Sequence, residues 1–377
     1  MPETVESIQF DRAGICLACQ SSEQKMRINW GEREQTLRRL LNDAKAKAGN
    51  NYDCIVPISG GKDSVFQLYV LTHVYEMKPL AVTFSHNWFS QTGMYNLLNC
   101  LEQFNVDHIM FTPNRKLVGK IARRSLEGIG DSCWHCHSGV GAFPLQAAVK
   151  FKIPLLIWGE SIAESSGRAS YDDPVRKFDR DYFTKVSAKL KPSQMACEYL
   201  SEKDLFPFEL PTAEECEEIG VYGIHLGDYI FWDDERQMEF VRDHFGWREC
   251  EKMENAIKCY KSAECIMAGV HDFTCYLKRG FARGTVQASL DVRNGLLSRR
   301  QGFELAAAKD CERPHSLDYF LEATGLTEDE FFEIMRKKRV AQLVDVELVV
   351  GKQSTAHPEP LVPYPQQIQS VSDNLSE

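Results

Sequence analysis

The sequence lacks the features of a membrane protein and of a secreted protein. No uninterrupted apolar run reaches the roughly 18 residues that a membrane-spanning helix needs. The first residues show no basic stretch followed by an apolar one, which is the pattern of a signal peptide. We therefore expect a cytoplasmic protein without a membrane among its partners.

An excess of positive charge is also missing. The chain has 44 Lys and Arg residues against 54 Asp and Glu residues, which gives a formal net charge of −10. A protein that coats DNA or RNA is usually basic, so nucleic acid is not an expected partner. A local basic groove remains compatible with this balance.

Cysteine, by contrast, is abundant, and its number is odd. The chain has 13 cysteines, most of them within apolar stretches. Because cytosolic thiols are kept reduced, closely spaced pairs indicate metal or redox chemistry rather than disulfides. The composition is otherwise average for a globular protein, with 43% hydrophobic and 26% charged residues. A chain of 377 residues can bury a core without such staples.

Apolar, strand-like runs alternate with helical segments between about residues 50 and 165. The runs cover residues 52–59, 78–86, 107–114 and 153–160. Strands that alternate with helices at this spacing predict an α/β fold with a doubly wound parallel sheet.

Changes in composition divide the chain into four parts. A short cysteine-containing segment, residues 1–30, precedes an α/β domain expected over residues 31–215. Residues 216–350 mix aromatic, basic and helical stretches, and we expect a mainly helical substrate-binding region there. Residues 351–377 are rich in Pro, Ser and Gln, which predicts a flexible tail.

The loop at residues 59–64 is the strongest motif. It follows an apolar run and opens a helix, in the order Ser59, Gly60, Gly61, Lys62, Asp63 and Ser64. Two glycines let the backbone turn sharply and approach an anion closely. Backbone N–H groups at the helix N-terminus then face the anion, and the lysine adds positive charge. The motif predicts a phosphate-binding turn; the alternative is a plain strand–helix turn of small residues.

This loop resembles the signature of the PP-loop ATP pyrophosphatases, which cleave ATP between its α and β phosphates and adenylate a substrate. The resemblance implies ATP and Mg²⁺ as ligands, with Lys62 and Asp63 as catalytic residues. It also implies that the ends of two later strands contribute to the nucleotide site. These positions are Thr83, Phe84, Ser85, Gly159 and Glu160. The region 31–215 would then be an ATP-binding domain.

Three further stretches resemble the N-acetyl sugar amidotransferases of surface-polysaccharide and lipopolysaccharide biosynthesis. The residues that carry this resemblance are Ile8, Gln9, Phe10, Asp11, Gly14, Ile15, Cys16, Leu17, Ala18 and Cys19; Leu226, Gly227, Asp228, Tyr229, Ile230, Phe231, Trp232 and Asp233; and His271, Asp272, Tyr276, Leu277, Lys278, Gly280, Phe281, Arg283, Gln287, Ala288, Ser289, Asp291, Arg293, Asn294 and Gly295. The resemblance runs from about residue 3 to about residue 345.

Membership of this family would imply a particular reaction. These enzymes are understood to convert the acetamido group of a sugar into an acetamidino group. ATP activates the amide oxygen, ammonia attacks the carbon, and AMP leaves. The ammonia is thought to come from a glutaminase partner with a cyclase-like companion. This chain shows no convincing glutaminase signature, so the resemblance implies both subunits as partners and a nucleotide-linked N-acetylated sugar as the substrate.

Two Cys-x-x-Cys pairs are candidate metal ligands. They are formed by Cys16 with Cys19 and by Cys133 with Cys136. The two-residue spacing lets both sulfurs of a pair reach one ion, and zinc is the expected metal. The family usually has another such pair ahead of its N-terminal segment. Either Met1 is an internal start, or that half of the site is lost, or the second pair completes it; accidental pairs of core residues are the alternative.

The second pair also allows a rival function. Some thiolating PP-loop enzymes use a Cys-x-x-Cys at a similar position, with a third Cys, to hold an iron–sulfur cluster. That resemblance implies a tRNA sulfur-transfer enzyme on the same ATP site. The acidic charge balance weighs against it, and the twin cysteine pairs weigh for it. A zinc-binding interaction module without activity is a third possibility, which the intact phosphate loop disfavours.

A group of basic residues follows in the last family-like stretch. Lys278, Arg283 and Arg293 are candidate ligands of a nucleotide diphosphate or carboxylate, since arginine suits bidentate contacts with such groups. Asp228, Asp233 and Asp234 are candidate partners of sugar hydroxyls or of Mg²⁺. The alternative is a solvated helix face for the basic group and an ordinary charged loop for the three aspartates.

Overall fold

The centre of the protein is a parallel sheet of five strands. The computed structural model describes residues 1–6, 8–165, 170–172 and 188–363. The strand order is β3-β2-β1-β4-β5, and all four strand pairs are parallel. The strands are β1 (Cys54–Pro57), β2 (Pro79–Phe84), β3 (Asp107–Phe111), β4 (Leu155–Trp158) and β5 (Tyr222–His225). The first four lie within the four expected runs.

The fifth strand lies outside the expected α/β domain. β5 pairs with β4, and Ile224 lies opposite Ile157. The sheet therefore extends past residue 215 into the segment expected to bind substrate. A strand of four residues is too short for its pattern to be distinguished from a loop by periodicity.

The chain up to residue 221 supplies most of the helices around the sheet. They are α1 (Leu17–Lys25), α2 (Trp30–Ala48), α3 (Lys62–Tyr69), α4 (Gln91–Phe104), α5 (Arg115–Ile129), α6 (Trp134–Phe151), α7 (Ile162–Ser165), α9 (Pro192–Met195), α10 (Glu202–Leu205) and α11 (Ala213–Ile219). A π-helical turn, η1 (Val70–Val74), continues α3, and a 3-10 turn, η3 (Phe206–Phe208), follows α10.

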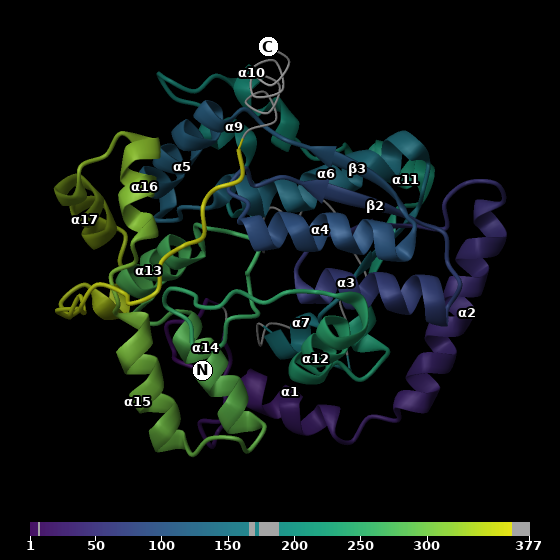
Figure 1. Cartoon of the computed structure of the whole chain (residues 1–377), viewed down its shortest axis with the longest axis horizontal. Coiled ribbons are helices and arrows are strands. Elements are labelled where there is room, and N and C mark those ends of the chain that lie inside the picture. The colour runs from purple at the N-terminus through teal and green to yellow at the C-terminus, as the bar shows by residue number, and fades with distance from the viewer. Residues whose placement is uncertain (7, 166–169, 173–187, 364–377) are drawn as a thin grey trace, which may run out of the picture.

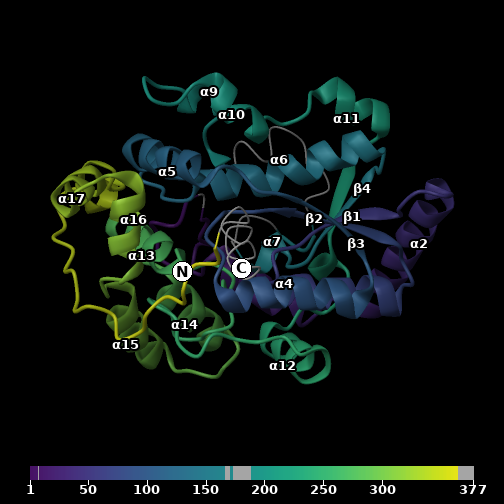
Figure 2. The ribbon, with the colours of Figure 1, turned by 45° about the horizontal axis from the view of Figure 1, so that its top comes forward.

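Helices cover both faces of the sheet, as Figure 2 shows. On one face, side chains of α6 pack against Ile55 and Leu156. On the other face, α2, α3 and α4 pack against Cys54 and Val56. Because successive strand residues point to opposite faces, continuous apolar strands fill both cores. The expected α/β class and the double winding are confirmed.

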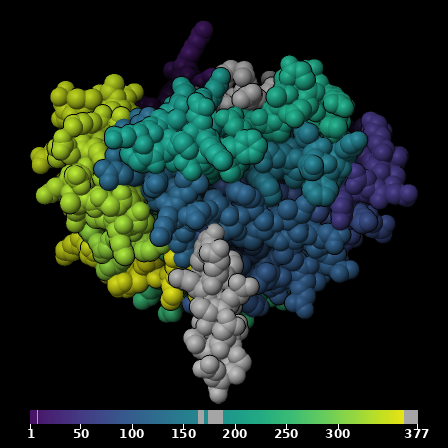
Figure 3. Space-filling model, turned by 90° about the horizontal axis from the view of Figure 1, so that it is seen from above, coloured from purple at the N-terminus to yellow at the C-terminus, as the bar shows by residue number. Residues whose placement is uncertain are grey.

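Beyond β5 the chain is mainly helical, as expected. Its elements are η4 (Leu226–Asp228), α12 (Asp234–Phe245), α13 (Ala268–Arg279), α14 (Arg283–Arg293), α15 (Arg299–Asp310), α16 (Ser316–Thr324), α17 (Glu328–Lys337) and η5 (Ala341–Leu343). The helices α13, α16 and α17 share an apolar core with α5, built around Val118, Phe273, Phe320 and Phe331. Figure 1 shows α13, α16 and α17 together to one side of the sheet, and in Figure 3 the yellow-green C-terminal residues gather on one side of the molecule. In the part of the chain that the structure describes, no helix is long and apolar enough to cross a membrane.

The segment after residue 350 makes more contacts than its composition predicts. The Glu359 carboxylate accepts hydrogen bonds from the Thr92 N–H at 2.8 Å and the Thr92 hydroxyl at 2.6 Å. The Val362 N–H donates to the Phe89 carbonyl at 3.1 Å. These contacts hold residues 359–362 against the start of α4. The rest of the expected tail, from residue 364 on, lies outside the described residues.

Candidate functional site

The order in which the chain adds strands to the sheet reverses between β1 and β4. From β1 the chain adds β2 and β3 on one side, and later β4 and β5 on the other. In open parallel sheets, ligands bind outside the carboxyl ends of the strands at such a point. The phosphate loop follows β1, and Gly159 and Glu160 follow β4. Two segments that the sequence assigns to the nucleotide site therefore leave the sheet side by side.

The phosphate loop passes so close to α4 that one position must be glycine. Gly60 has a φ of +83°, and a Cβ there would lie 2.7 Å from both the Gly93 carbonyl oxygen and the Leu97 nitrogen. The indole N–H of Trp247 donates to the Gly60 carbonyl at 3.0 Å. Packing on both sides fixes the path of the loop, and only glycine combines this φ with this approach.

The loop ends at the N-terminus of α3. The Ser59 N–H donates to the Ser64 hydroxyl at 3.0 Å, and the Gly61 N–H donates to the Ser59 hydroxyl at 3.3 Å. Gly61 is the N-cap residue of α3 and offers no side-chain acceptor to the first helical N–H groups. An uncapped helix N-terminus reached by a glycine loop has the polarity and the access that a phosphate requires.

Two lysines and three carboxylates gather at this loop. Lys62, with a side chain only 1% exposed, places its ammonium 2.6 Å from Asp63 and 2.9 Å from Asp234. Lys261 also pairs with Asp234, and its ammonium lies 3.8 Å from Glu160. A shared carboxylate, Asp234, thus links the two cations.

Burial and neighbouring charges shift the pKa values of these groups in opposite directions. Burial raises the pKa of Glu160 to about 7, and Lys261 only partly offsets this rise. Burial would also raise the pKa of Asp234, but Lys62 and Lys261 outweigh it, so this pKa lies well below its usual range. Burial acts to lower the pKa of Lys62, yet Asp63 and Asp234 raise it overall. Near neutral pH the lysines are therefore charged while Glu160 titrates.

A further glutamate lies over the loop. The Oε2 atom of Glu264 is 3.5 Å from the position that a Cβ on Gly61 would occupy. Burial raises the pKa of Glu264, although Arg283 and Ser59 act in the opposite direction. The backbone of Glu264 also covers the start of α4, where a Cβ on Gly93 would lie 2.2 Å from its Cα atom.

These residues fit the phosphates of ATP. The glycines give close backbone approach, α3 presents its N-terminus, and Lys62 and Lys261 supply positive charge. Mg²⁺ in such sites is usually held by one or two carboxylates together with substrate phosphates, so a dedicated protein cage is not needed. Asp63 is the least buried carboxylate here, at 37% exposed, and could meet such an ion.

The three expected nucleotide positions at the end of β2 have structural partners. The Thr83 hydroxyl donates to the Ile58 carbonyl at 2.8 Å. Phe84 packs against Phe111 and Phe208 on the α6 side of the sheet. The Ser85 hydroxyl accepts a hydrogen bond from a backbone N–H two residues on, at 3.1 Å. Their side chains join β2 to its neighbours, and a role toward adenosine stays a prediction.

The four expected substrate residues do not converge. The Lys278 ammonium donates to the Ile129 carbonyl at 2.6 Å. Arg293 donates to the Ser289 hydroxyl at 2.8 Å, one turn back on α14. These two cations thus have separate local partners, and neither lines the cavity that Arg283 lines.

Asp228 and Arg283 are also engaged within the protein. Asp228 is buried and accepts a hydrogen bond from the Ser161 hydroxyl, just after β4. Arg283 pairs with Asp272 of α13 and donates to the Lys261 carbonyl at 3.0 Å. Arg283 therefore lies next to the loop that carries Lys261. Unlike the other three expected substrate residues, Arg283 lines the cavity described next.

This cavity has a volume of about 220 Å³ and lies between α13, α14 and the preceding loop. Its lining includes both polar and apolar side chains: Lys258, Tyr260, Lys261, His271, Asp272, Cys275, Phe281, Ala282, Arg283, Val286, Gln287 and Leu290. Two of these residues also lie near the phosphate loop. Lys261 belongs to the charged cluster of Lys62, Asp63, Glu160, Asp234 and Lys261, and the Lys62 ammonium lies 5.7 Å from the ring centre of Tyr260.

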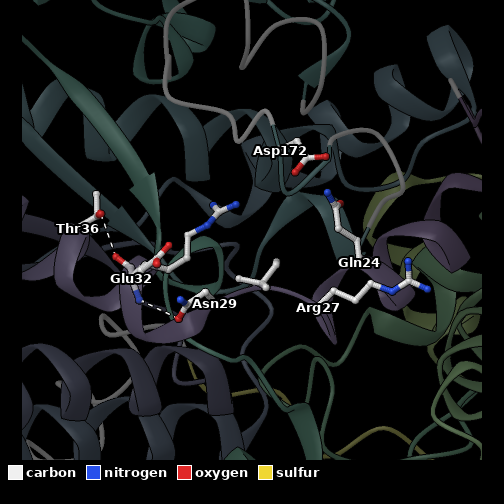
Figure 4. A pocket seen from close by; sticks show the side chains of 8 residues that line it. Gln24, Arg27, Asn29, Glu32, Thr36 and Asp172 are labelled. Carbon is white, nitrogen blue, oxygen red and sulfur yellow. Dashed lines mark hydrogen bonds between the residues drawn. The ribbon is translucent and has the colours of Figure 1, made fainter.

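A second, polar hollow of about 480 Å³ lies where α1 meets α2 (Figure 4). Gln24, Arg27 and Asp172 border it on one side, and Asn29 and Glu32 on the other. The Asn29 side chain caps α2 by accepting from the Glu32 N–H at 3.3 Å. This hollow contains none of the residues of the charged cluster.

The two cysteine pairs lie in different environments. The sulfurs of Cys16 and Cys19 are 3.5 Å apart at the start of α1. Cys133 is the N-cap residue of α6 and packs with Cys136 and Cys265 in the core of the C-terminal helices. Burial and nearby groups raise the pKa of all three of these thiols.

Zinc does not fit the cysteines as the structure places them. Within residues 1–6, 8–165, 170–172 and 188–363, no three His, Cys, Asp or Glu side chains form a group that could hold a metal ion. The alternative in which the two pairs share one ion therefore has no support in the described residues, and zinc at these cysteines stays a prediction. A structural zinc site needs four ligands, and Cys16 with Cys19 supplies two.

Two residues of the site, Lys261 and Glu264, were not among the expected ones. Asp234 was expected to hold sugar hydroxyls or Mg²⁺, and its pairing with Lys62, 172 positions away, was not foreseen. All three residues reach the phosphate loop from segments far along the chain. Lys261 and Glu264 lie in an irregular segment where no local pattern marks them.

One family model matches the C-terminal part of the chain. Residues 244–344, about a quarter of the chain, match the family described as LPS biosynthesis protein WbpG-like, C-terminal domain. This stretch contains Lys261, Glu264 and Arg283. It also contains every residue that lines the 220 Å³ cavity.

Two further similarities are partial. The chain is 30% identical over 105 residues to uncharacterized protein MJ1599 of Methanocaldococcus jannaschii, over 28% of this chain and 37% of that protein. The match thus spans little more than a third of the relative. A solved structure, NMN synthetase from Francisella tularensis, aligns with 60% of this chain and 99% of its own at 13% identity and a TM-score of 0.28. That score is too low to support a common fold.

Proposed function

We propose that the protein is an ATP-dependent amidotransferase of surface-glycan biosynthesis, which converts the acetamido group of an N-acetylated sugar into an acetamidino group. One observation carries the proposal. A glycine loop and the N-terminus of α3 meet two carboxylate-paired lysines, Lys62 buried and Lys261 half-buried, at the switch point of a parallel sheet. The match of residues 244–344 to a WbpG-like LPS biosynthesis domain supports the glycan assignment.

The proposed reaction has two steps. The amide oxygen of the acetamido group forms a bond to the α-phosphorus of ATP, and the bond from that phosphorus to the β-phosphate oxygen breaks, releasing pyrophosphate. Ammonia then attacks the activated carbon, its nitrogen loses a proton, and the carbon–oxygen bond to AMP breaks. The products are an acetamidino group, AMP and pyrophosphate.

The residues of the site suit the first step. Negative charge moves onto the leaving pyrophosphate, and preorganised positive charge there lowers the barrier. Lys62 and Lys261 would supply it, and the carboxylate of Asp234 holds both ammonium groups in place until phosphate arrives. Mg²⁺, when bound with ATP, would neutralise phosphate charge, and Asp63 would meet it.

Ammonia is proposed to come from partner subunits, a glutaminase and its cyclase-like companion. At neutral pH free ammonia is mostly ammonium, which has no lone pair for attack. Delivery of ammonia from a partner into a water-poor site would avoid this loss. The particular sugar and its nucleotide carrier are left open by this proposal.

Formation of AMP tests the proposal directly. The purified protein is incubated with ATP, Mg²⁺, ammonium chloride and a panel of nucleotide-linked acetamido sugars, and AMP and pyrophosphate are measured by chromatography. We expect both to appear in equal amounts and only with sugar and ammonium together. Release of ADP and phosphate instead, or no dependence on ammonium, would contradict the proposal.

A sulfur-transfer enzyme is the second candidate, and one observation favours it. Cys265 packs with Cys133 and Cys136 in one apolar cluster, and Cys265 directly follows Glu264, which lies over the phosphate loop. Their raised pKa values disfavour thiolates at neutral pH, which sulfur transfer would need. AMP release that requires tRNA rather than a sugar, and that is lost in Cys136→Ser, would favour this candidate.

A further inference from the structure

The 220 Å³ cavity shares a wall with the phosphate loop. Tyr260 and Lys261 line the cavity. The Lys62 ammonium lies 5.7 Å from the centre of the Tyr260 ring, and Lys261 pairs with Asp234, the partner of Lys62. Only the side chains of Tyr260 and Lys261 therefore separate a ligand in the cavity from the site proposed for the phosphates of ATP.

The charged groups of the lining are already paired. Lys258 lies 2.6 Å from Asp291 and also pairs with Glu235. Arg283 holds Asp272, which is 5% exposed and also contacts His271. Lys261 is paired as described above. Because each lining charge has a partner within the protein, the cavity favours a ligand that carries no charge at that end.

The side-chain amide of Gln287, another polar group of the lining, is committed to the backbone. The side-chain oxygen of Gln287 accepts from the Ile257 N–H at 2.7 Å and the Lys258 N–H at 3.1 Å, and its amide donates to the Lys258 carbonyl at 3.0 Å. Gln287 thus fixes the loop that leads to Lys261. The surface left for a ligand is formed largely by Phe281, Val286 and Leu290.

We propose that this cavity binds the acyl group of the acetamido substituent, an inference that rests on the proposed function. The methyl group lies among Phe281, Val286 and Leu290, and the carbonyl oxygen points past Lys261 toward the phosphate loop. This arrangement suits the proposed reaction, because the amide oxygen must reach the α-phosphorus of ATP while the methyl group points away from it. Val286, on the cavity side of α14, then limits the length of the acyl chain.

Binding of simple acetamido sugars tests the inference without any turnover. Saturation-transfer difference NMR is recorded with N-acetylglucosamine and, as a ligand without an acyl group, with glucosamine. In the wild-type protein the acetyl methyl protons should receive more saturation than the ring protons. In Val286→Trp, which fills the cavity, the N-acetylglucosamine signal should fall to the level of glucosamine. The matched control is Leu296→Trp, at an exposed side chain just after α14, and it should behave as wild type.

A second variant covers the case in which Val286→Trp disturbs α14. Val286→Ala enlarges the cavity, so the terminal methyl of N-butanoylglucosamine should receive more saturation than it does in the wild type. Equal acetyl signals in Val286→Trp and wild type, or stronger saturation of the ring than of the methyl in wild type, would overturn the inference. If Val286→Trp leaves AMP formation unaffected, the acyl site in this cavity is refuted while the proposed reaction stands. If the NMR results are as expected but no AMP forms, the proposed reaction is refuted while the acyl site stands.

Discussion

At the residue scale, the phosphate loop depends on a lysine that is buried and not exposed. The sequence suggests an open loop, yet the side chain of Lys62 is only 1% exposed. A buried ammonium is tolerated only when carboxylates pair with it, and Asp63 and Asp234 do so. Removing the charge of Lys62 would therefore leave Asp63 without this partner and Asp234 with Lys261 alone.

Replacing Lys62 should therefore affect activity and stability together. In Lys62→Met, pyrophosphate release in the AMP assay should fall by about 10²-fold or more, as is typical of losing one charge-stabilising group. The melting temperature, measured by calorimetry, should fall as well because Asp234 keeps only Lys261. Lys309→Met removes a more exposed pair with Glu312 and serves as control. Undiminished pyrophosphate release by Lys62→Met would refute the assignment of the loop.

Glu160 predicts a pH-dependent stability. Its pKa in the folded protein is about 7, against an ordinary value of 4.5. Below pH 4.5 the carboxyl of Glu160 is protonated in both the folded and the unfolded protein. As the pH rises from about 4.5 to 7, this carboxyl ionises in the unfolded protein before it does in the folded one, so the free energy of unfolding decreases. Glu160→Gln should therefore raise the melting temperature at pH 8 relative to wild type. The gain should shrink toward pH 5, and the exposed Glu23→Gln should show no such trend. A gain that is equal at both pH values would contradict the burial effect.

At the scale of elements, the start of α4 and the phosphate loop fit together at glycines. Gly60 approaches the backbone of α4, and Gly93 of α4 approaches Glu264. Three segments from distant parts of the chain thus touch through backbone alone. Such contact leaves no room for a methyl group, so the loop path and the position of α4 depend on one another.

Gly60→Ala separates this steric effect from backbone strain. Both Gly60 and Gly220 have positive φ, at +83° and +70°, but a Cβ at Gly220 would meet nothing within 4 Å. We expect Gly220→Ala to cost about 1–2 kcal/mol of unfolding free energy, from the left-handed backbone alone, with pyrophosphate release unchanged. Gly60→Ala should cost more and abolish pyrophosphate release. Chemical denaturation measures the loss of unfolding free energy, and the AMP assay measures the loss of activity. An equal loss of unfolding free energy in both variants would show that α4 moves to accommodate the methyl group.

At the scale of the whole molecule, the site is assembled from two regions. The sheet supplies the loop, α3 and Glu160, whereas Lys261, Glu264 and the cavity come from the part that matches the WbpG-like domain. Neither region alone contains both the phosphate loop and the cavity. The proposed chemistry therefore requires that they remain packed together.

The source of ammonia gives a prediction at this scale. Glutamine alone should not support AMP formation by the purified chain, whereas a high concentration of ammonium chloride should. The rate with ammonium should rise with pH below the pKa of ammonium, because the unprotonated form is the nucleophile. Addition of a glutaminase with its cyclase-like companion should make glutamine effective. Efficient use of glutamine by the chain alone would contradict the dependence on partners.

Local sequence patterns were sufficient for the sheet and for its first loop. Four strands were predictable because each is a continuous apolar run bounded by turns, and the phosphate loop because two glycines, a lysine and a helix start stand in consecutive positions. The class of fold follows from the alternation of such segments. These features depend only on neighbouring residues, so the sequence by itself determined them.

Only the tertiary structure decided which distant side chains complete the site. Lys278, Arg283 and Arg293 look like one basic group along the chain, yet helix packing gives each a different partner and leaves only Arg283 at the cavity. Asp234, at the start of α12, joins Lys62 to Lys261, and Lys261 lies in an irregular segment. β5 escaped detection because four residues carry too little pattern. Contacts between residues far apart in the chain arise from packing of whole elements, and no local spacing records them.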